Sequence, residues 1–254
     1  MTIAVLPETV ALFLLLFARI GALVMLLPAL GERQIPTNVR LAFALSLSAV
    51  FYPFTVAALP AGVTSDMARL LTTLVGEILV GASFGLLTRI LIAATQVAGA
   101  AIAANIGLGF VQTVDPTMGQ QGAIIGSFLG VTGMTLIFVT NLHHLAIAGV
   151  ADSYAMFPPG EMLPLDDLKD AAVMIVAETF KVGIQLAAPF IVFALVFNLG
   201  LGVLAKLMPQ LQVFFIAMPV SIGVGLLIFS LLVSTMMGWY LGHLEAGFMR
   251  LIAG

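Results

Sequence analysis

The charged side chains that interrupt the apolar stretches of this sequence are its first candidates for chemistry. They are Arg19, Glu77, Arg89, Glu178 and Lys181. Each of them costs roughly 2.5–3.5 kcal/mol at the centre of a membrane helix unless it is paired or faces protein or water. Such residues are therefore expected to mark an ion or proton path, or a buried contact between helices.

The spacing of these residues favours buried contacts. Glu178 and Lys181 are close enough on one predicted helix to pair with each other, and we interpret them as a structural pair rather than as ion or proton carriers. Glu77 and Arg89 lie about three helical turns apart, too far for a local pair. Each therefore needs a partner from another helix or another chain, and we expect Arg19, Glu77 and Arg89 to be buried in interfaces.

Two adjacent histidines, His143 and His144, suggest a metal or haem site at first sight. Neighbouring residues on a helix point about 100° apart, so these two cannot share one ion, and the only other histidine is His243. We interpret His143 and His144 as buried, hydrogen-bonded interface residues. Because no Ser-His-Asp or paired-carboxylate spacing stands out, no catalytic, cofactor-binding or metal-binding residue is predicted, and the chain is not expected to be an enzyme.

The composition identifies lipid as the solvent of this chain. Its 254 residues are 61% hydrophobic and 8% charged, with a mean hydropathy of +1.19. Soluble surfaces carry roughly a quarter or more charged residues, so a soluble enzyme is excluded. The net charge of −3, without a basic cluster, argues against nucleic-acid binding, and the absence of cysteine removes disulfides and thiolate metal sites.

The apolar runs predict an all-α integral membrane protein with about six hydrophobic segments. They cover residues 9–30, 41–59, 70–111, 122–151, 171–204 and 211–241. As one helix, the run 70–111 would be about 63 Å long, roughly twice the thickness of the hydrocarbon core. We therefore expect bent helical hairpins, with a bend near 99–109. The alternative is an assembly whose helices run past one another outside ordinary bilayer geometry.

Two connections between these runs have unusual compositions. The segment 152–170 carries five acidic residues against one lysine and is predicted to be an aqueous loop, in which the consecutive Pro158 and Pro159 exclude helix. The segment 107–122 is only mildly polar, which suits a pore lining or plug, although a surface turn explains its composition equally well. The candidate pore-loop residues are Gln112, Thr113, Asp115, Pro116, Met118, Gln120 and Gln121.

Small residues recur at the spacing that lets membrane helices approach closely. The pairs are Gly81 with Gly85, Gly126 with Gly130, and Gly238 with Gly242. They predict a tightly packed membrane assembly, with packing inside the chain as the alternative. The basic residues that flank the apolar runs balance between the two sides, so the positive-inside rule leaves the orientation open.

Short motifs in a fixed order carry a resemblance to a known family. They are FARIG at 17–21, QIPTNVRLA at 34–42, GEILVGASFG at 76–85, DP at 115–116, NLHH at 141–144, AP at 188–189 and MPQLQVF at 208–214. In this order, over about residues 17–230, the sequence resembles the FliR family of flagellar export proteins and its injectisome relatives. Leu142 departs from the glycine that the family more usually has before the paired histidines.

The resemblance implies a non-enzymatic core subunit of the flagellar type III export gate, without cofactors. Such subunits lie in the bacterial inner membrane at the flagellar basal body, in contact with membrane lipid, where they pass unfolded flagellar proteins. They join FliP and FliQ in a helical ring, and FlhB and FlhA complete the apparatus. The resemblance further implies a FliP-like part at 1–170, a FliQ-like hairpin at 171–254, and a role for 107–122 in closing the pore.

Other classes of membrane protein remain as alternatives. A small-solute permease needs a polar site near the midplane, often with inverted repeats, and neither a repeat nor a charge cluster is found. A haem or quinone oxidoreductase needs more histidines in suitable places. A subunit of a non-flagellar injectisome is the alternative within the same family.

Overall fold

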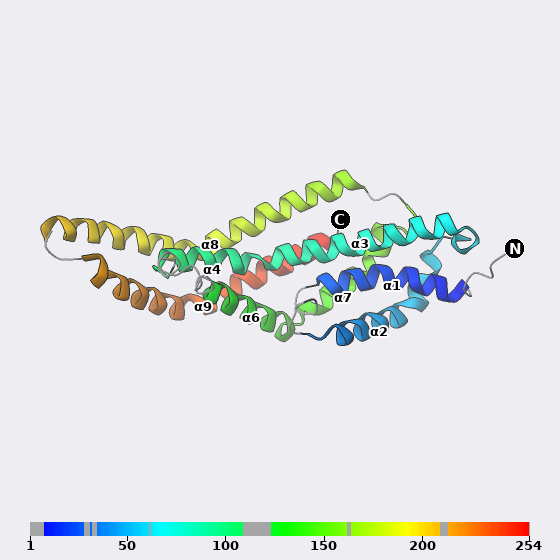
Figure 1. The fold of residues 1–254 in the computed structure, drawn as a ribbon, viewed down its shortest axis with the longest axis horizontal. Helices are drawn as coiled ribbons and strands as arrows, with labels where there is room; N and C mark the ends of the chain where they lie inside the picture. Colours follow the sequence, from blue (N-terminus) through cyan, green and yellow to red (C-terminus); the bar gives the residue numbers. More distant parts are fainter. Residues whose placement is uncertain are drawn as a thin grey trace. The chain divides into compact units, whose positions relative to one another are not determined.

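The structure is a computed structural model that describes residues 8–27, 31, 35–60, 62–108, 123–161, 164–208 and 213–253 (Figure 1). Helices and turns make up these residues, and no strand occurs among them, which confirms the predicted all-α fold. In chain order the helices are α1 (Glu8–Leu26), α2 (Thr37–Thr55), the short η1 (Val56–Ala58) and η2 (Val63–Ser65), α3 (Met67–Ile92), α4 (Ala94–Asn105), α6 (Ala123–Val139), α7 (Leu142–Met156), α8 (Leu165–Leu207) and α9 (Val213–Ala253).

The helices match the predicted apolar runs. Five helical stretches are long and apolar enough to cross a membrane: Glu8–Leu26, Thr37–Ala58, Met67–Asn105, Leu165–Leu207 and Phe215–Leu251. The pair α6 and α7, which a short break separates, also qualifies when the two helices are taken together. The chain is therefore a multi-pass membrane protein, as predicted.

The long run 70–111 stays helical for longer than expected. Apart from a break at Ala93, helix continues from Met67 to Asn105, because the stretch before Asn105 is rich in alanine, the best helix former. At about 1.5 Å per residue this stretch is about 58 Å long. The chain first turns at residues 106–108, where Gly107 adopts a φ of 94°, so the predicted bend falls at the far end of 99–109.

The acidic loop is shorter than the sequence predicts. Helix α7 includes Asp152 and continues to Met156, while α8 begins at Leu165 with Asp166 and Asp167 in its first turn. Acidic residues in a first turn stabilise the helix through its dipole, so these aspartates promote helix rather than loop. The segment that contains Pro158 and Pro159 is not helical, as predicted.

The bend between α6 and α7 occurs at an asparagine. Asn141 has a left-handed conformation with a φ of 60°, which asparagine tolerates better than most residues other than glycine. Its main-chain carbonyl accepts a hydrogen bond from the His144 amide at 3.0 Å. The left-handed residue therefore ends one helix and starts the next within a few residues.

The chain forms two compact units. The first contains residues 1–91, 138–175 and 245–254, and the second contains residues 92–137 and 176–244. The core of the first unit joins α1, α2, α3 and α7 through buried residues that include Leu16, Ile20, Ala44, Val80 and Val150. The predicted division into a FliP-like part at 1–170 and a FliQ-like hairpin at 171–254 is a likeness to other proteins, and it stays a prediction.

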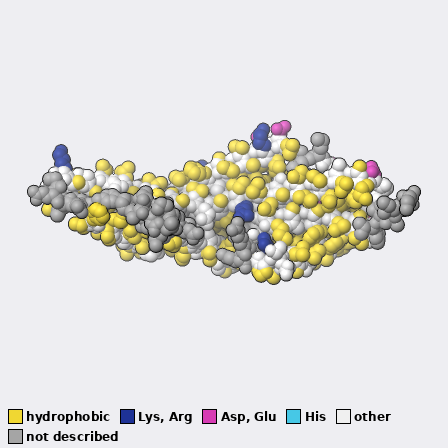
Figure 2. All heavy atoms as spheres, viewed as in Figure 1, with side chains coloured by type: hydrophobic (Ala, Val, Ile, Leu, Met, Phe, Trp, Pro, Cys, Tyr) yellow, Lys and Arg dark blue, Asp and Glu magenta, His cyan; other side chains and the backbone are white. Residues whose placement is uncertain are grey.

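The surface of the chain is largely apolar. On the face drawn in Figure 2, hydrophobic side chains cover much of the described surface and charged side chains are few. Phe54, Leu207 and Leu231 are 79%, 73% and 72% exposed. Such a surface requires lipid or other apolar helices as its neighbours.

Glycines on α3 bring its backbone against α1 in the first unit. A Cβ atom added at Gly81 would fall on the Arg19 carbonyl oxygen, and one added at Gly85 would lie 2.7 Å from Leu26 Cβ and 3.0 Å from the Leu23 carbonyl oxygen. Lipid tails are as apolar as the helices, so close packing of this kind is a main source of helix association in membranes. Packing within the chain, the alternative reading, is thus correct for Gly81 and Gly85.

We predict that Gly81→Ala destabilises the chain strongly while Gly76→Ala does not. The added methyl group at Gly81 must displace the α1 backbone, whereas a Cβ at Gly76, on the same helix, meets nothing within 4 Å. Overpacking of this kind costs about 1–3 kcal/mol. The free energy of unfolding of both variants in mixed micelles measures the difference, and equal stabilities would contradict the packing described here.

Candidate functional site

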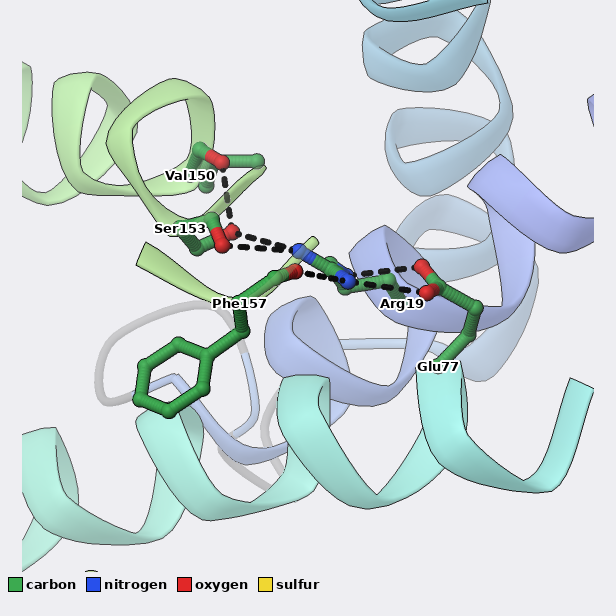
Figure 3. A network of polar contacts seen from close by, with 5 residues as sticks. All are labelled: Arg19, Glu77, Val150, Ser153 and Phe157. Carbon is green, nitrogen blue, oxygen red and sulfur yellow. Dashed lines mark hydrogen bonds and ion pairs between the residues drawn. The ribbon is translucent and has the colours of Figure 1, made fainter. Parts of the chain in front are cut away.

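A single arginine in the middle of α1 is the centre of the most extensive polar network that the structure describes. Arg19 is 1% exposed, although α1 is otherwise almost entirely apolar. Its guanidinium group lies between α3 and the carboxyl end of α7 (Figure 3). A cation with so little exposed surface must be satisfied mainly by protein groups.

Glu77 of α3 supplies the opposite charge. Arg19 Nε donates to Glu77 Oε2 at 2.7 Å, and Arg19 Nη2 donates to Glu77 Oε1 at 2.8 Å. This bidentate arrangement is the strongest that an arginine and a carboxylate can form. Glu77 is 1% exposed, so both charges of the pair are buried. Glu77 and Gly81 are one helical turn apart, and both face α1.

The remaining donors of Arg19 bind the end of α7. Nη1 donates to the Ser153 carbonyl oxygen at 2.9 Å and lies 3.5 Å from Ser153 Oγ, while Nη2 donates to the Phe157 carbonyl oxygen at 2.8 Å. The Ser153 carbonyl also accepts a hydrogen bond from the Phe157 amide at 3.0 Å, and carbonyls at the end of a helix carry partial negative charge. Arg19 therefore acts as a C-cap for α7, supplied from a distant part of the sequence.

Tyr154 completes the surroundings of the guanidinium group. The Arg19 Cζ atom lies 4.0 Å from the centroid of the Tyr154 ring, which is the geometry of a cation–π contact. The Tyr154 hydroxyl is buried and has no hydrogen-bond partner among the described residues. The ring face, rather than the hydroxyl, is thus the part of Tyr154 that contributes to the network.

A cleft of about 500 Å³ opens beside this network. The first turns of α3, including Arg69 and Thr73, line one side, and the segment after α7, including Phe157 and Glu161, lines the other. The lining also includes the Arg19–Glu77 pair. The pair therefore forms part of the wall between the packed helices and this cleft.

This arrangement is suited to holding helices together rather than to catalysis. Every polar nitrogen of Arg19 already has an acceptor within hydrogen-bond distance. Both oxygens of Glu77 are bound by the same guanidinium group. A group that is satisfied in this way has no spare donor for a substrate, so the network acts as a lock between α1, α3 and α7.

The other predicted interface residues have mixed outcomes. Arg89 is exposed on the chain, and its burial against a partner from another helix or another chain stays a prediction. His143 is half-buried, with its ring 5.2 Å from that of Phe138 and 4.2 Å from that of His144, which is exposed. His143 Nδ1 is buried without a hydrogen bond among the described residues, so the predicted hydrogen bond is not seen at this atom.

The predicted Glu178–Lys181 pair and the candidate pore-loop residues stay predictions. Glu178 is half-buried and Lys181 is exposed, and their pairing stays a prediction. The candidate pore-loop residues lie outside the described residues: Gln112, Thr113, Asp115, Pro116, Met118, Gln120 and Gln121. No group of three or more histidine and acidic side chains that could hold a metal ion occurs in the part of the chain that the structure describes.

Sequence reasoning missed the acceptors that α7 provides. Ser153 and Phe157 bind Arg19 mainly through main-chain carbonyl oxygens. Every residue has such an oxygen, so the amino-acid type does not reveal this role. A weak signal exists in Pro158 and Pro159, because consecutive prolines mark a helix end and hence a set of free carbonyls. The prolines indicate where a helix ends, but they do not indicate which residue caps that end.

Comparison with known proteins gives consistent matches over most of the chain. A family model described as "Bacterial export proteins, family 1" matches residues 10–247. The chain is 39% identical to the flagellar biosynthetic protein FliR of Caulobacter vibrioides over 223 residues, which is 87% of each chain. It is 31% identical to the flagellar biosynthetic protein FliR of Bacillus subtilis, over 84% of this chain and 82% of the relative. The Yop proteins translocation protein T of Yersinia pestis is 23% identical, over 82% of this chain and 80% of the relative.

We predict that Glu77→Ala lowers stability and assembly far more than Glu178→Ala. Removing Glu77 leaves the Arg19 cation buried without its counter-charge, at a cost of about 3–5 kcal/mol. Glu178 is half-buried, so its removal leaves less uncompensated charge in the interior. The measurements are the free energy of unfolding in mixed micelles and the yield of assembled complex, and similar losses for both variants would count against the lock.

A matched change at Arg19 separates its charge from its geometry. Arg19→Lys keeps the positive charge but offers a compact ammonium group that cannot bind Glu77 and the α7 carbonyls together. We expect this variant to be destabilised by more than the roughly 1 kcal/mol of one ordinary hydrogen bond. A lysine variant as stable as the parent chain would show that charge alone suffices.

Proposed function

The chain belongs to the bacterial export proteins of family 1, and from this membership we propose that it is a core subunit of the flagellar type III export gate, where it helps to form and seal the secretion pore. Membership makes the chain a multi-pass membrane component of a flagellar or type III export system. The observation that carries the finer proposal is the extent of the family match, which includes residues from both compact units. In this role the chain is not an enzyme.

The flagellar system is favoured over an injectisome. The FliR proteins of Caulobacter vibrioides and Bacillus subtilis are 39% and 31% identical to this chain, against 23% for the Yersinia pestis translocation protein. We therefore infer that the exported substrates are unfolded flagellar proteins. We place the chain in the bacterial inner membrane, at the flagellar basal body.

The proposed partners are FliP and FliQ in a helical ring, with FlhB and FlhA completing the apparatus. Exposed apolar helices support partners of this kind, since Leu195, Leu199 and Leu231 of α8 and α9 are 61%, 65% and 72% exposed. A Cβ added at Gly238 or Gly242 meets nothing within 4 Å in the chain. Small residues with open space above them allow the backbone of another helix to come close.

The segment 107–122 is proposed to close the resting pore. Helix α4 ends at Asn105 and α6 begins at Ala123, so the segment connects two helices of the second unit. Its sequence is too polar to pack in lipid and too weakly charged for an ordinary aqueous loop. A mildly polar segment suits membrane depth where it faces protein or a water-filled pore.

We predict that the chain is recovered as a stable complex only when it is produced with its proposed partners. Deletion of its gene is expected to abolish export of flagellar proteins, and a plasmid copy is expected to restore it. Export is measured as secreted flagellar protein, and assembly as co-purification of FliP and FliQ with a tagged chain. A deletion strain that exports normally, or a chain that purifies without either partner, would contradict the proposed role.

We further predict that shortening the segment 112–121 leaves the complex assembled but makes the membrane leaky to small ions. A gate for unfolded polypeptide must be wide during export and sealed at rest, so loss of the sealing segment opens a path for ions. Ion conductance is measured in reconstituted membranes that carry the parent or the shortened complex, with assembly checked by co-purification. Unchanged conductance in a fully assembled complex would falsify the sealing role and leave the family membership intact.

A further inference from the structure

The cleft beside the Arg19 network is built from two ordered segments of the first compact unit. Its volume of about 500 Å³ is in the usual range of ligand-binding clefts. Arg69, in the first turn of α3, lines one side, and Glu161, after α7, lines the other. The Glu161 amide donates a hydrogen bond to the Pro158 carbonyl oxygen at 3.2 Å, which closes a turn. The cleft therefore has a helix as one wall and a hydrogen-bonded turn as the other.

A glycine brings this turn close to α3. Gly160 has a φ of 87°, a left-handed conformation that glycine adopts readily. A Cβ added at Gly160 would lie 3.2 Å from Pro60 Cγ and 3.9 Å from Thr73 Oγ1. The backbone next to Glu161 is thus packed near the second turn of α3, so the two walls of the cleft keep a set spacing.

The two walls carry opposite charges that the described chain does not use. The Arg69 and Glu161 side chains are exposed, and neither has a hydrogen bond or an ion pair among the described residues. The Thr72 and Thr73 hydroxyls donate to carbonyls of their own helix, and the ion pair of Arg19 is satisfied internally. One cation and one anion are therefore left to face a ligand.

An apolar strip continues from these charges along α3. Val75 and Leu79 also line the cleft, and they are 55% and 50% exposed. Gly76 lies between them, and a Cβ added there meets nothing within 4 Å, so the helix surface is hollowed at this position. Helix α3 begins a stretch that is long and apolar enough to cross a membrane, where exposed apolar side chains take hydrocarbon neighbours. The site is consequently amphipathic, charged at the start of α3 and apolar further along it.

We propose that this cleft binds one phosphatidylethanolamine molecule, with its phosphate at Arg69, its ammonium group at Glu161 and an acyl chain along Val75 and Leu79. Arginine matches the geometry of phosphate oxygens, and a carboxylate accepts strong hydrogen bonds from an ammonium group. An anionic phospholipid offers no cation to Glu161, so a zwitterionic headgroup is the better match to the two walls. The bound lipid joins α3 to the turn after α7. This inference does not depend on the proposed export role.

The test presents two phospholipids with identical acyl chains, phosphatidylethanolamine and phosphatidylglycerol, to the tagged full-length chain. The chain is purified in mild detergent together with the partners that it retains. Native mass spectrometry over a series of lipid concentrations measures the number of lipids bound per chain and their affinity. The parent chain is expected to bind one phosphatidylethanolamine about tenfold more tightly than phosphatidylglycerol, because the charged hydrogen bond to Glu161 is absent in the second lipid.

Two substitutions each remove one charge from the cleft. Arg69→Gln is expected to weaken the binding of both lipids about tenfold, because both contain a phosphate. Glu161→Gln is expected to weaken only phosphatidylethanolamine and thereby abolish the preference between the two lipids. Arg89→Gln and Asp167→Asn are the matched controls, since they remove exposed charges of α3 and α8 outside the cleft. Both controls are expected to bind as the parent does.

A third substitution tests the space rather than the charges. Gly76→Leu fills the hollow on α3 and is expected to weaken both lipids while the free energy of unfolding without added phospholipid stays unchanged. Binding at the parent level in Arg69→Gln and Glu161→Gln, or in Gly76→Leu, would overturn the site. Equal affinities of the parent for the two lipids would overturn the zwitterionic headgroup. A parent chain that binds neither lipid and cross-links to a partner protein from position 76 would make the cleft a protein interface, and the lipid proposal would fall. None of these readouts uses export, so failure here leaves the proposed function intact.

Discussion

A guanidinium group inside an apolar helix must find acceptors from the protein around it, and the arrangement of the first compact unit follows from that requirement. Arg19 takes a carboxylate from α3 and main-chain carbonyls from the end of α7. Each of these acceptors has to lie within about 3 Å of a nitrogen atom, which fixes the distance and the rotation of both helices relative to α1. A shift of either helix by a single residue would break hydrogen bonds of the buried guanidinium group.

Glycine makes this distance possible. The α3 backbone approaches the Arg19 carbonyl so closely at Gly81 that no side chain fits between them. Elsewhere in the chain, glycines such as Gly200 and Gly238 have nothing within 4 Å of an added Cβ. The same residue type thus has two roles, which the sequence does not distinguish. At Gly81 and Gly85 it joins helices of one chain, whereas the open positions leave room for neighbours outside it.

Much of the fold could be predicted from the sequence, because long apolar runs in a chain with so few charges leave little choice but membrane helices. The residues Arg19 and Glu77 were also identifiable, since charge inside an apolar run is costly. Their pairing was not identifiable, because it depends on the register of two helices separated by 58 positions. Arg89 follows the same sequence rule as Glu77 and yet is exposed, which shows that cost alone does not determine where a charge is placed.

The boundaries of loops were predicted less well, for a physical reason that recurs. Acidic residues near 152–170 indicate water in a count of charges, but at the start of α8 they interact with the helix dipole. Alanines near 99–105 indicate close packing and equally a preference for helix. The composition of a segment is compatible with either structure, and the contacts that the segment makes in the folded chain determine which one forms.

The order in which the chain is made gives the Arg19 network a consequence for biogenesis. Arg19 is synthesised well before its α7 acceptors, because Ser153 lies 134 positions and Phe157 138 positions further along the chain. At about 5–20 residues per second, synthesis of that length takes roughly 7–28 seconds. During this interval the arginine can meet Glu77 but not its remaining acceptors. The Arg19 network can therefore be complete only after α7 has been synthesised.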